Sequence, residues 1–295
     1  MCVTTLYGGN APDAEVRMAQ SAHTVDQTGN GFIDGTHAAL LRRVGEIREQ
    51  CAEGAPRETV LPSFDAFVDE MTVHFGHEEL ILRASGFPGW EEHAEQHQAL
   101  GRQVGRLVDY LRACDVSQEF LCTVAGTLDG ALSRHEITCD GAYASLLRAA
   151  PAPAPGADLI DWNAGFETGV EPIDAQHREL AGLVNEVHRL SVGVHDRAEA
   201  LALLERVGHH VRAHFEAEER VMRAASPTRC LNHAASHELM EWQFRAMCEQ
   251  VAAGVVDLEV ASRDFLRFWL MDHILVCDRP HFLLMGLAQP VRALS

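Results

Sequence analysis

The sequence has few cationic side chains and no long apolar run. Its 24 lysines and arginines stand against 43 aspartates and glutamates, which gives a formal net charge of −19 at pH 7. Nucleic acids and anionic membrane surfaces attract basic faces, so this balance argues against both as partners. No stretch reaches the roughly 18 apolar residues that a spanning helix needs, and the first residues lack the basic and apolar regions of a secretory signal. We therefore expect a cytoplasmic protein.

Paired cysteines are also lacking. The eight cysteines form no CxxC pair, so their spacing predicts neither a zinc site nor a disulfide framework. In a reducing compartment most of them are small core residues. Histidine, by contrast, is frequent, with 17 residues against three tyrosines. The histidines therefore carry the strongest chemical signal in the sequence.

A proline-rich stretch divides the chain. Residues 149–157 read AAPAPAPGA. Proline at every second position cannot continue a helix and favours a short, stiff connector. We therefore predict one domain at residues 1–148, a linker at 149–157 and a second domain at 158–295.

The two halves repeat one pattern. IDGTH, which ends at His37, is matched by IDAQH, which ends at His177, at an offset of 140 residues. The same offset relates His74 to His214, and it becomes 138 in the last part of each half, as a loop deletion would produce. The chain is therefore interpreted as a tandem duplication.

Each half has the apolar periodicity of helices and no strand-like alternation. Leu40, Leu41, Val44 and Ile47 illustrate the helical spacing. Breaks fall near 54–62, 86–89, 113–117, 192–196, 226–228 and 254–257. Four helices joined by short loops pack as an antiparallel bundle. We predict an all-α protein of two tandem up-down four-helix bundles, each with a metal site in its core.

Both halves place the same candidate metal ligands on these helices. Residues four apart share a helix face, so HFxxE and HxxxH each aim two side chains at one point. The first set is His37, His74, Glu78, His93, His97, His135 and Asp140, and the second is His177, His214, Glu218, His233, His237, His273 and Asp278. Such groups are unstable in a core unless cations bind them. A pair of metal ions in each half would neutralise them.

The donor set indicates which metal. If both carboxylates bridge, the five imidazoles and one shared oxygen leave the pair one position short of two octahedra. Imidazole and carboxylate ligands in this geometry favour iron over tetrahedral structural zinc. An open position on a redox-active ion suits dioxygen.

These residues resemble the hemerythrin family, and its bacterial branch most of all. The family pattern is a histidine on the first helix, HFxxEE on the second, HxxxH on the third and HxxxxD on the fourth, and both halves match it. The resemblance implies a non-heme di-iron centre with a bridging oxo or hydroxo group in each half, hence four irons per chain.

The resemblance also implies how the ligands divide between the ions. In the first half His93, His97 and His135 would bind one iron, His37 and His74 the other, and Glu78 and Asp140 would bridge. In the second half His233, His237 and His273 would bind one iron, His177 and His214 the other, and Glu218 and Asp278 would bridge. The iron with fewer histidines would bind dioxygen.

The halves differ around the expected oxygen pocket. The resemblance implies that the second pocket is walled by Trp269, Leu270 and Ile274. The corresponding residues of the first half are Ala131, Leu132 and Glu136. We expect a roomier and wetter first pocket, although drift at tolerant positions would also explain the difference. Seven further histidines are expected at the surface: His23, His77, His188, His195, His209, His210 and His281.

The leading interpretation is reversible dioxygen binding, for storage, delivery or sensing, rather than catalysis. One alternative is a di-iron enzyme that acts on peroxide or another small oxidant, especially at the first site. The other is iron handling or repair, which more distant members of the family perform with fewer matching ligands. The sequence leaves open a reductase or an oxygen-consuming partner.

Overall fold

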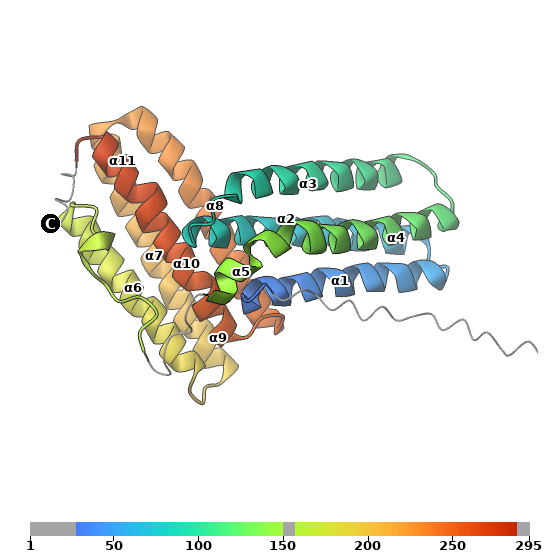
Figure 1. The fold of residues 1–295 in the computed structure, drawn as a ribbon, viewed down its shortest axis with the longest axis horizontal. Coiled ribbons are helices and arrows are strands. Elements are labelled where there is room, and N and C mark those ends of the chain that lie inside the picture. The colour runs from blue at the N-terminus through green and yellow to red at the C-terminus, as the bar shows by residue number, and fades with distance from the viewer. Residues whose placement is uncertain (1–27, 150–156, 288–295) are drawn as a thin grey trace, which may run out of the picture.

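The computed structural model describes residues 28–149 and 157–287, and every regular element in these ranges is helical. The first half contains α1 (Gly31–Ala52), α2 (Arg57–Ala84), α3 (Trp90–Ala113), α4 (Gln118–His135) and α5 (Gly141–Ala149). The second contains α6 (Glu171–Ser191), α7 (Arg197–Ala225), α8 (Pro227–Ala253), α9 (Leu258–Val260), α10 (Arg267–Asp272) and α11 (Arg279–Leu284). Figure 1 shows each half as a bundle of long helices joined by short turns. The predicted all-α fold of two bundles is confirmed.

The predicted linker at 149–157 falls almost entirely on residues 150–156, which lie outside the described residues. The domain boundaries therefore stay predictions. Within the described ranges, no helix combines the length and the apolar character that crossing a membrane requires.

Short polar motifs set the helix ends. Asn30, Ser117 and Asp196 accept hydrogen bonds from backbone N–H groups in the first turns of α1, α4 and α7, which satisfies donors that a helix start leaves free. Gly254 ends α8 with φ +72°, a left-handed conformation that suits glycine. The break expected at 54–62 was predicted too long, because α2 contains Pro62 near its start, where a missing N–H costs only one helical bond.

The chain enters the first helix of both bundles through the same turn. Thr28 donates from its backbone N and its hydroxyl to Asp34 Oδ1, over 2.8 and 2.7 Å. Thr168 makes the equivalent bonds to Asp174, over 2.7 and 2.8 Å. The aspartate of the repeated ID dipeptide therefore anchors the segment that leads into the ligand helix.

The last long helical segment of each half, which is the fourth of its bundle, contains π-helical turns. The segment η1 (Glu136–Asp140) joins α4 to α5, and η3 (Ala261–Leu266) and η4 (His273–Asp278) flank α10. On an α-helix, residues five apart point about 140° away from each other. A π turn, with its i→i+5 hydrogen bonds, brings them to one side. The five-residue spacing of HxxxxD carried this signal, which the sequence analysis did not use.

The two bundles share a buried aromatic interface. Phe32 of α1 stacks on Phe265 of η3 with ring centroids 4.8 Å apart. The ring of His77 on α2 lies edge-on to Phe265 at 4.7 Å. One continuous apolar cluster contains Phe32 and Leu82 of the first half together with Phe265 and Trp269 of the second. The end of the first bundle that carries its ligands therefore packs into the core of the second (Figure 1).

Polar contacts fix α2 against α8 and α10 at this interface. Arg83 Nε and Nη2 donate to the two oxygens of the buried Asp272 over 2.7 and 2.6 Å. Gln243 Nε2 donates to the Gly76 carbonyl over 2.9 Å. His77 Nε2 donates to the Gln243 carbonyl, also over 2.9 Å. Helix α2 carries ligands of the first half, and Asp272 precedes the ligand His273, so the interface touches both candidate sites.

Two histidines expected at the surface are buried, so that prediction was wrong for His77 and His188. His77 lies between the bundles. His188 lies on α6 with its Nδ1 3.3 Å from Ser262 Oγ. The sequence of one half does not show which of its faces packs against the other half, so the face of α2 that carries His77 resembles a solvated one. His23 lies outside the described residues.

We predict that His77 makes folding stability depend on pH. Burial lowers the pKa of His77 to about 3, despite its hydrogen bond to the Gln243 carbonyl. As the pH falls from about 6.5 towards 3, the unfolded chain takes up a proton that the folded chain excludes, so this stability is complete above pH 6.5 and lost below it. At pH 5 the loss is about 2 kcal/mol.

His77→Gln keeps a donor for the Gln243 carbonyl and removes the titration. Urea unfolding of this variant should show a drop between pH 7.5 and pH 5 that is about 2 kcal/mol smaller than that of the wild type. The partly exposed His195 is the control, and His195→Gln should leave the drop unchanged. Equal drops in all three proteins would contradict the prediction.

Candidate metal centres

Each of the four long helical segments of a bundle contributes residues to its candidate site. In the first half the seven predicted ligands come from α1, α2, α3, α4 and η1, and none is more than 8% exposed. In the second half they come from α6, α7, α8 and η4, and none is more than 3% exposed. The structure thus brings both predicted sets together in the bundle interiors, and it buries the second more completely.

In the first centre the imidazoles surround the two carboxylates. His93 Nε2 lies 2.9 Å from Glu78 Oε1, and His74 Nε2 lies 3.2 Å from Glu78 Oε2. His37 Nε2 and His135 Nε2 each lie 3.3 Å from an oxygen of Asp140. Donor atoms within 4.8 Å of one another form three groups: His93, His97 and His135; His37, His74 and Glu78; and Glu78, His93 and Asp140.

In the second centre three imidazoles point at one another. His214 Nε2 lies 3.1 Å from His177 Nε2 and 2.9 Å from His273 Nε2. Donor atoms within 4.8 Å form two groups: His177, His214, His273 and Asp278; and Glu218, His237, His273 and Asp278. His273 belongs to both groups, so the division of ligands between two ions stays a prediction here.

The donor atoms fit a pair of cations. In the first centre, among the described residues, His97 Nε2, His135 Nε2 and both oxygens of Asp140 have no hydrogen-bond partner. Among the described residues, both oxygens of Asp278 in the second centre likewise have no hydrogen-bond partner. Buried polar atoms without partners are costly, and converging lone pairs repel unless a positive charge lies between them. Nitrogen and oxygen donors in this number suit a transition-metal pair.

The carboxylates control the protonation of the imidazoles. Burial lowers the pKa of His37, but the nearby Asp140 and Glu78 carboxylates outweigh this effect and raise it to about 9. In the second centre burial also opposes protonation of His233, and Asp278 and Glu218 likewise raise its pKa to about 9. Each centre therefore holds a proton at neutral pH that a metal ion would have to displace.

Outer residues orient the ligands, which the sequence analysis did not predict. His97 Nδ1 donates to Glu79 Oε1 over 2.9 Å, and His237 Nδ1 donates to Glu219 Oε1 over 3.0 Å. Because these acceptors hold the proton on Nδ1, the Nε2 lone pair points inward to a metal. The second glutamate of HFxxEE was the available signal. Thr36 accepts from His74 Nδ1 over 2.9 Å in the same way.

The centres differ at one position beside the bridging carboxylate. The Tyr143 hydroxyl donates to Glu78 Oε1 over 2.5 Å. Its counterpart, His281, instead lies with its ring 4.8 Å from that of His233 and donates to the Cys277 carbonyl. The first bridging carboxylate therefore has a hydroxyl donor that the second lacks.

The residues expected to wall the oxygen pockets also differ in burial. Trp269, Leu270 and Ile274 are fully buried. Leu132 and Glu136 are buried, whereas Ala131 is partly exposed. The Glu136 charge helps to raise the pKa of His37, after the larger effects of burial, Asp140 and Glu78, which places it beside the first centre. That these six residues contact dioxygen stays a prediction.

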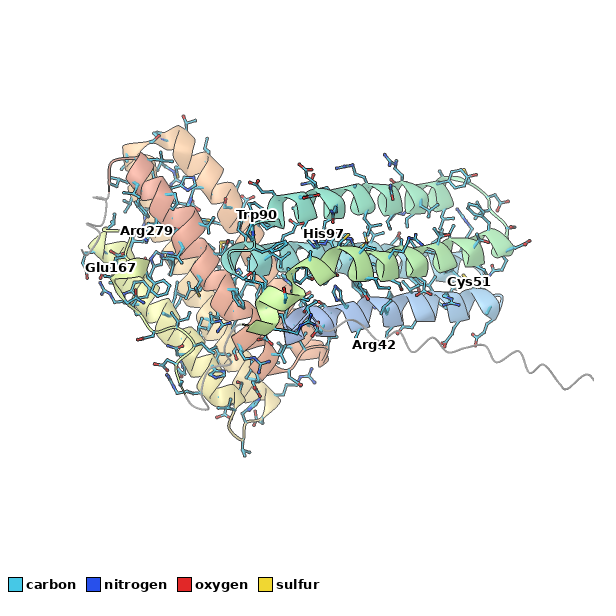
Figure 2. All side chains as sticks on the ribbon, in the orientation of Figure 1. Arg42, Cys51, Trp90, His97, Glu167 and Arg279 are labelled. Carbon is cyan, nitrogen blue, oxygen red and sulfur yellow. The ribbon has the colours of Figure 1, made fainter. Side chains whose placement is uncertain are left out.

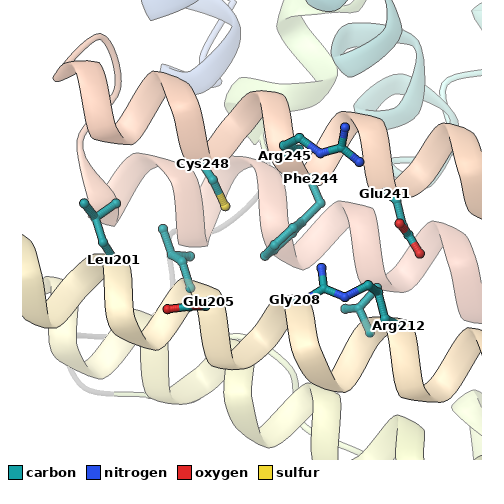
Figure 3. A pocket seen from close by; sticks show the side chains of 10 residues that line it. Leu201, Glu205, Gly208, Arg212, Glu241, Phe244, Arg245 and Cys248 are labelled. Carbon is teal, nitrogen blue, oxygen red and sulfur yellow. The ribbon is translucent and has the colours of Figure 1, made fainter.

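Packing from α7 and α8 supports the tryptophan of the second centre. The ring of Phe244 lies 5.5 Å from that of Trp269, and Trp269 Nε1 donates to the Met240 carbonyl over 3.2 Å. Figure 3 shows Phe244 leaning towards Gly208, where a Cβ atom would come within 3.1 Å of its ring. Glycine at 208 therefore leaves room for the ring that holds Trp269.

Comparison with known proteins gives matches in both halves. The hemerythrin HHE cation binding domain family matches residues 28–135 and 168–279. A bacteriohemerythrin of Stenotrophomonas maltophilia is 28% identical over 116 residues, which cover 39% of this chain and 74% of that protein. A bacteriohemerythrin of Methylococcus capsulatus is 27% identical over 122 residues, 41% of this chain and 92% of that protein. No solved structure matches the chain.

We predict that metal binding competes with protons. Because the pKa values of His37 and His233 are raised to about 9 in the metal-free protein, binding must release a proton from each centre. Apparent affinity should therefore rise about tenfold per pH unit and per proton between pH 6.5 and 8.5. Anaerobic titration with ferrous iron against a chelator, with an indicator dye for released protons, measures both. An affinity that stays constant over this range would contradict the prediction.

Proposed function

Because the chain belongs to the hemerythrin family, with two HHE domains in tandem, we propose that both halves hold a pair of iron ions and bind dioxygen reversibly. The observation that carries the proposal is the buried set of five imidazoles and two carboxylates in each half. Their donor atoms converge within 4.8 Å in overlapping groups that include all of them except His233, whose Nε2 lies 3.2 Å from oxygens of Glu218 and Asp278. The similarity to bacteriohemerythrins supports it. Storage, delivery and sensing are all compatible with such binding.

The side chains would divide the work of holding such a pair. Glu78 and Asp140 lie between the histidine groups, where each can give one oxygen to each ion. Glu79 fixes the tautomer of His97, as described above. When bound there, a ferrous pair would supply the redox chemistry that reversible dioxygen binding requires.

Exclusion of water favours reversible binding over turnover. The candidate ligands of the second centre are at most 3% exposed, and the buried apolar residues Trp269 and Ile274 lie close in sequence to its candidate ligand His273, in α10 and η4. Buried apolar side chains would keep water and protons away from a small ligand bound there and so limit side reactions. The burial of the second centre therefore suits a carrier or sensor.

A second candidate function, peroxide turnover, applies to the first centre. Glu136 is buried beside it, at the position that Ile274 takes in the other half. A carboxyl group there can hand a proton to a reacting oxygen species. The iron-handling alternative is less well supported, because both ligand sets are complete.

Metal analysis and an absorption spectrum test the proposal. We expect four irons per fully loaded chain and a visible band that disappears on deoxygenation and returns with air. Two irons or fewer would contradict the iron count. Irreversible bleaching while added peroxide is consumed would favour the enzyme.

We predict that removing one bridge empties one centre only. Asp278→Ala takes away a carboxylate whose oxygens lie 3.0 Å from both His177 and His273. Iron should fall from four to two per chain, with half of the oxygen-dependent absorbance retained, because the ligands of the first centre are intact. Asp140→Ala is the matched variant in the first half. Loss of all four irons in either variant would mean that the shared interface makes the bundles one folding unit.

We also predict that the first centre loses reversible oxygen binding sooner. The comparison uses the full chain, with Asp278→Ala leaving the first centre and Asp140→Ala leaving the second, because separated halves would expose Phe32 and Phe265. The first centre should decay about a hundredfold faster, the lower end of what a positioned proton donor supplies. Adding Glu136→Ile and Ala131→Trp to the Asp278→Ala chain should slow the decay. Equal lifetimes of the two oxygenated centres in stopped-flow experiments would contradict the prediction, and the sequence difference between the two pockets would then be evolutionary drift.

A further inference from the structure

A cleft lies between the bundles, on the outer side of the first centre. It is bounded by α2, α3 and α8 and has a volume of about 420 Å³. This volume is within the range typical of small-molecule sites. Its apolar lining includes Phe75, Leu80, Trp90, Leu239 and Trp242. Figure 2 shows Trp90 and His97 on the end of α3 that lies nearest the second bundle.

The equivalent face of the second half is charged at three of the positions that line this cleft. Three lining residues of the first half are small or apolar: Gly76, Leu80 and Gly101. At the offset of 140 residues their counterparts are Glu216, Arg220 and Glu241. A Cβ atom on residue 76 would make an ordinary contact with the Trp242 ring at 3.6 Å, so a glutamate there would extend from α2 into the cleft. The lining of the cleft is therefore particular to the first half and not shared by the second.

The cleft carries arginines in a strongly acidic protein. The guanidinium of Arg83 lies 5.4 Å from the centre of the Trp90 ring and is held there by Asp272. Arg102 also lines the cleft and is exposed, with no ion-pair partner in the described parts of the chain. The cleft's carboxylate, Glu79, is engaged by His97. An unpaired guanidinium beside indole rings suits an anion that carries an aromatic group.

The floor of the cleft leads to the first centre. His97 lines it, and the Phe75 ring stacks on the His97 ring with centroids 3.9 Å apart and planes 9° apart. A planar group bound in the cleft would lie close to a predicted iron ligand. Electrons could therefore enter the first centre from this side.

From the lining, the charge and the floor we propose that this cleft binds a planar aromatic anion of the flavin nucleotide type, with its ring against the tryptophans and its phosphate towards Arg102. Binding itself does not depend on the proposed function, but its purpose does. A reduced flavin would give one electron to each of two ferric ions, become oxidised flavin and release its two protons to solvent. No bond to the protein forms or breaks.

Flavin fluorescence tests the binding on the full chain as purified. Titration with flavin mononucleotide should give saturable binding of one molecule per chain. Riboflavin, which has the same ring without phosphate, should bind about tenfold more weakly, the size of one partly screened charge contact. Inorganic phosphate at the same concentration should not displace the flavin. Displacement by phosphate alone would overturn the aromatic part of the proposal, and the absence of saturable binding would overturn all of it.

Matched variants one helical turn apart place the site. Gly101→Glu puts into the cleft the carboxylate that the second half carries at Glu241, and no atom lies within 4 Å of a Cβ at 101 or at the control position Gly105. Gly101→Glu should weaken flavin mononucleotide binding at least tenfold, about one charge contact, and Gly105→Glu should not. Equal binding by these two variants would overturn the assignment.

The arginine is tested in the same way. Arg102→Gln should reduce flavin mononucleotide binding to the level of riboflavin and leave riboflavin unchanged, whereas Arg106→Gln, outside the cleft, should have no effect. An unchanged Arg102→Gln variant would overturn the role of this arginine. Iron content and the oxygen-dependent spectrum are recorded on the same preparations. Failure of flavin binding is thereby separated from failure of the iron centres.

Discussion

Burial of seven polar ligands in the middle of each bundle is the constraint on which the rest of the structure depends. Two carboxylates and five imidazoles lose their hydration there, and without cations they would weaken the core that they occupy. Their donor atoms must therefore meet within a few ångströms. The threonine–aspartate turn before the first helix, the π turn between His135 and Asp140, and the bond from His97 to Glu79 each fix one ligand-bearing segment.

The interface between the bundles uses the same segments. Arg83 lies on α2, little more than one turn beyond Glu78, and its partner Asp272 directly precedes His273. A shift of α2 against α10 would therefore move ligands of both centres, and the buried Asp272 would lose its counter-charge. Breaking such a pair on one side typically costs about 3 to 5 kcal/mol. The two bundles are thus held together by a specific interface and not by the linker alone.

The sequence was informative where chemistry is local and periodic. The repeated spacing of His74, Glu78 and their counterparts predicted the bundles and the ligand sets, because four-residue spacing has one meaning on a helix. Contacts between the two halves could not be predicted from the sequence in this way. His77 was taken for a surface residue because its neighbours come from the other half, and Gly76 gave no hint that Trp242 packs on it. The π turns could have been predicted from HxxxxD, because two ligands five residues apart share one side of a helix only where it contains a π turn.

Duplication allows the two centres to diverge while one interface stabilises both. The candidate ligands of the second centre are at most 3% exposed, and Trp269 and Ile274, near His273 in the sequence, belong to the larger apolar cluster. The first centre has Glu136 and the Tyr143 hydroxyl beside its ligands and a cleft against His97. Polar groups beside a metal site can hand on protons, whereas an apolar shell limits the access of solvent. Under the proposed function, the second half is therefore suited to holding oxygen and the first to exchanging electrons.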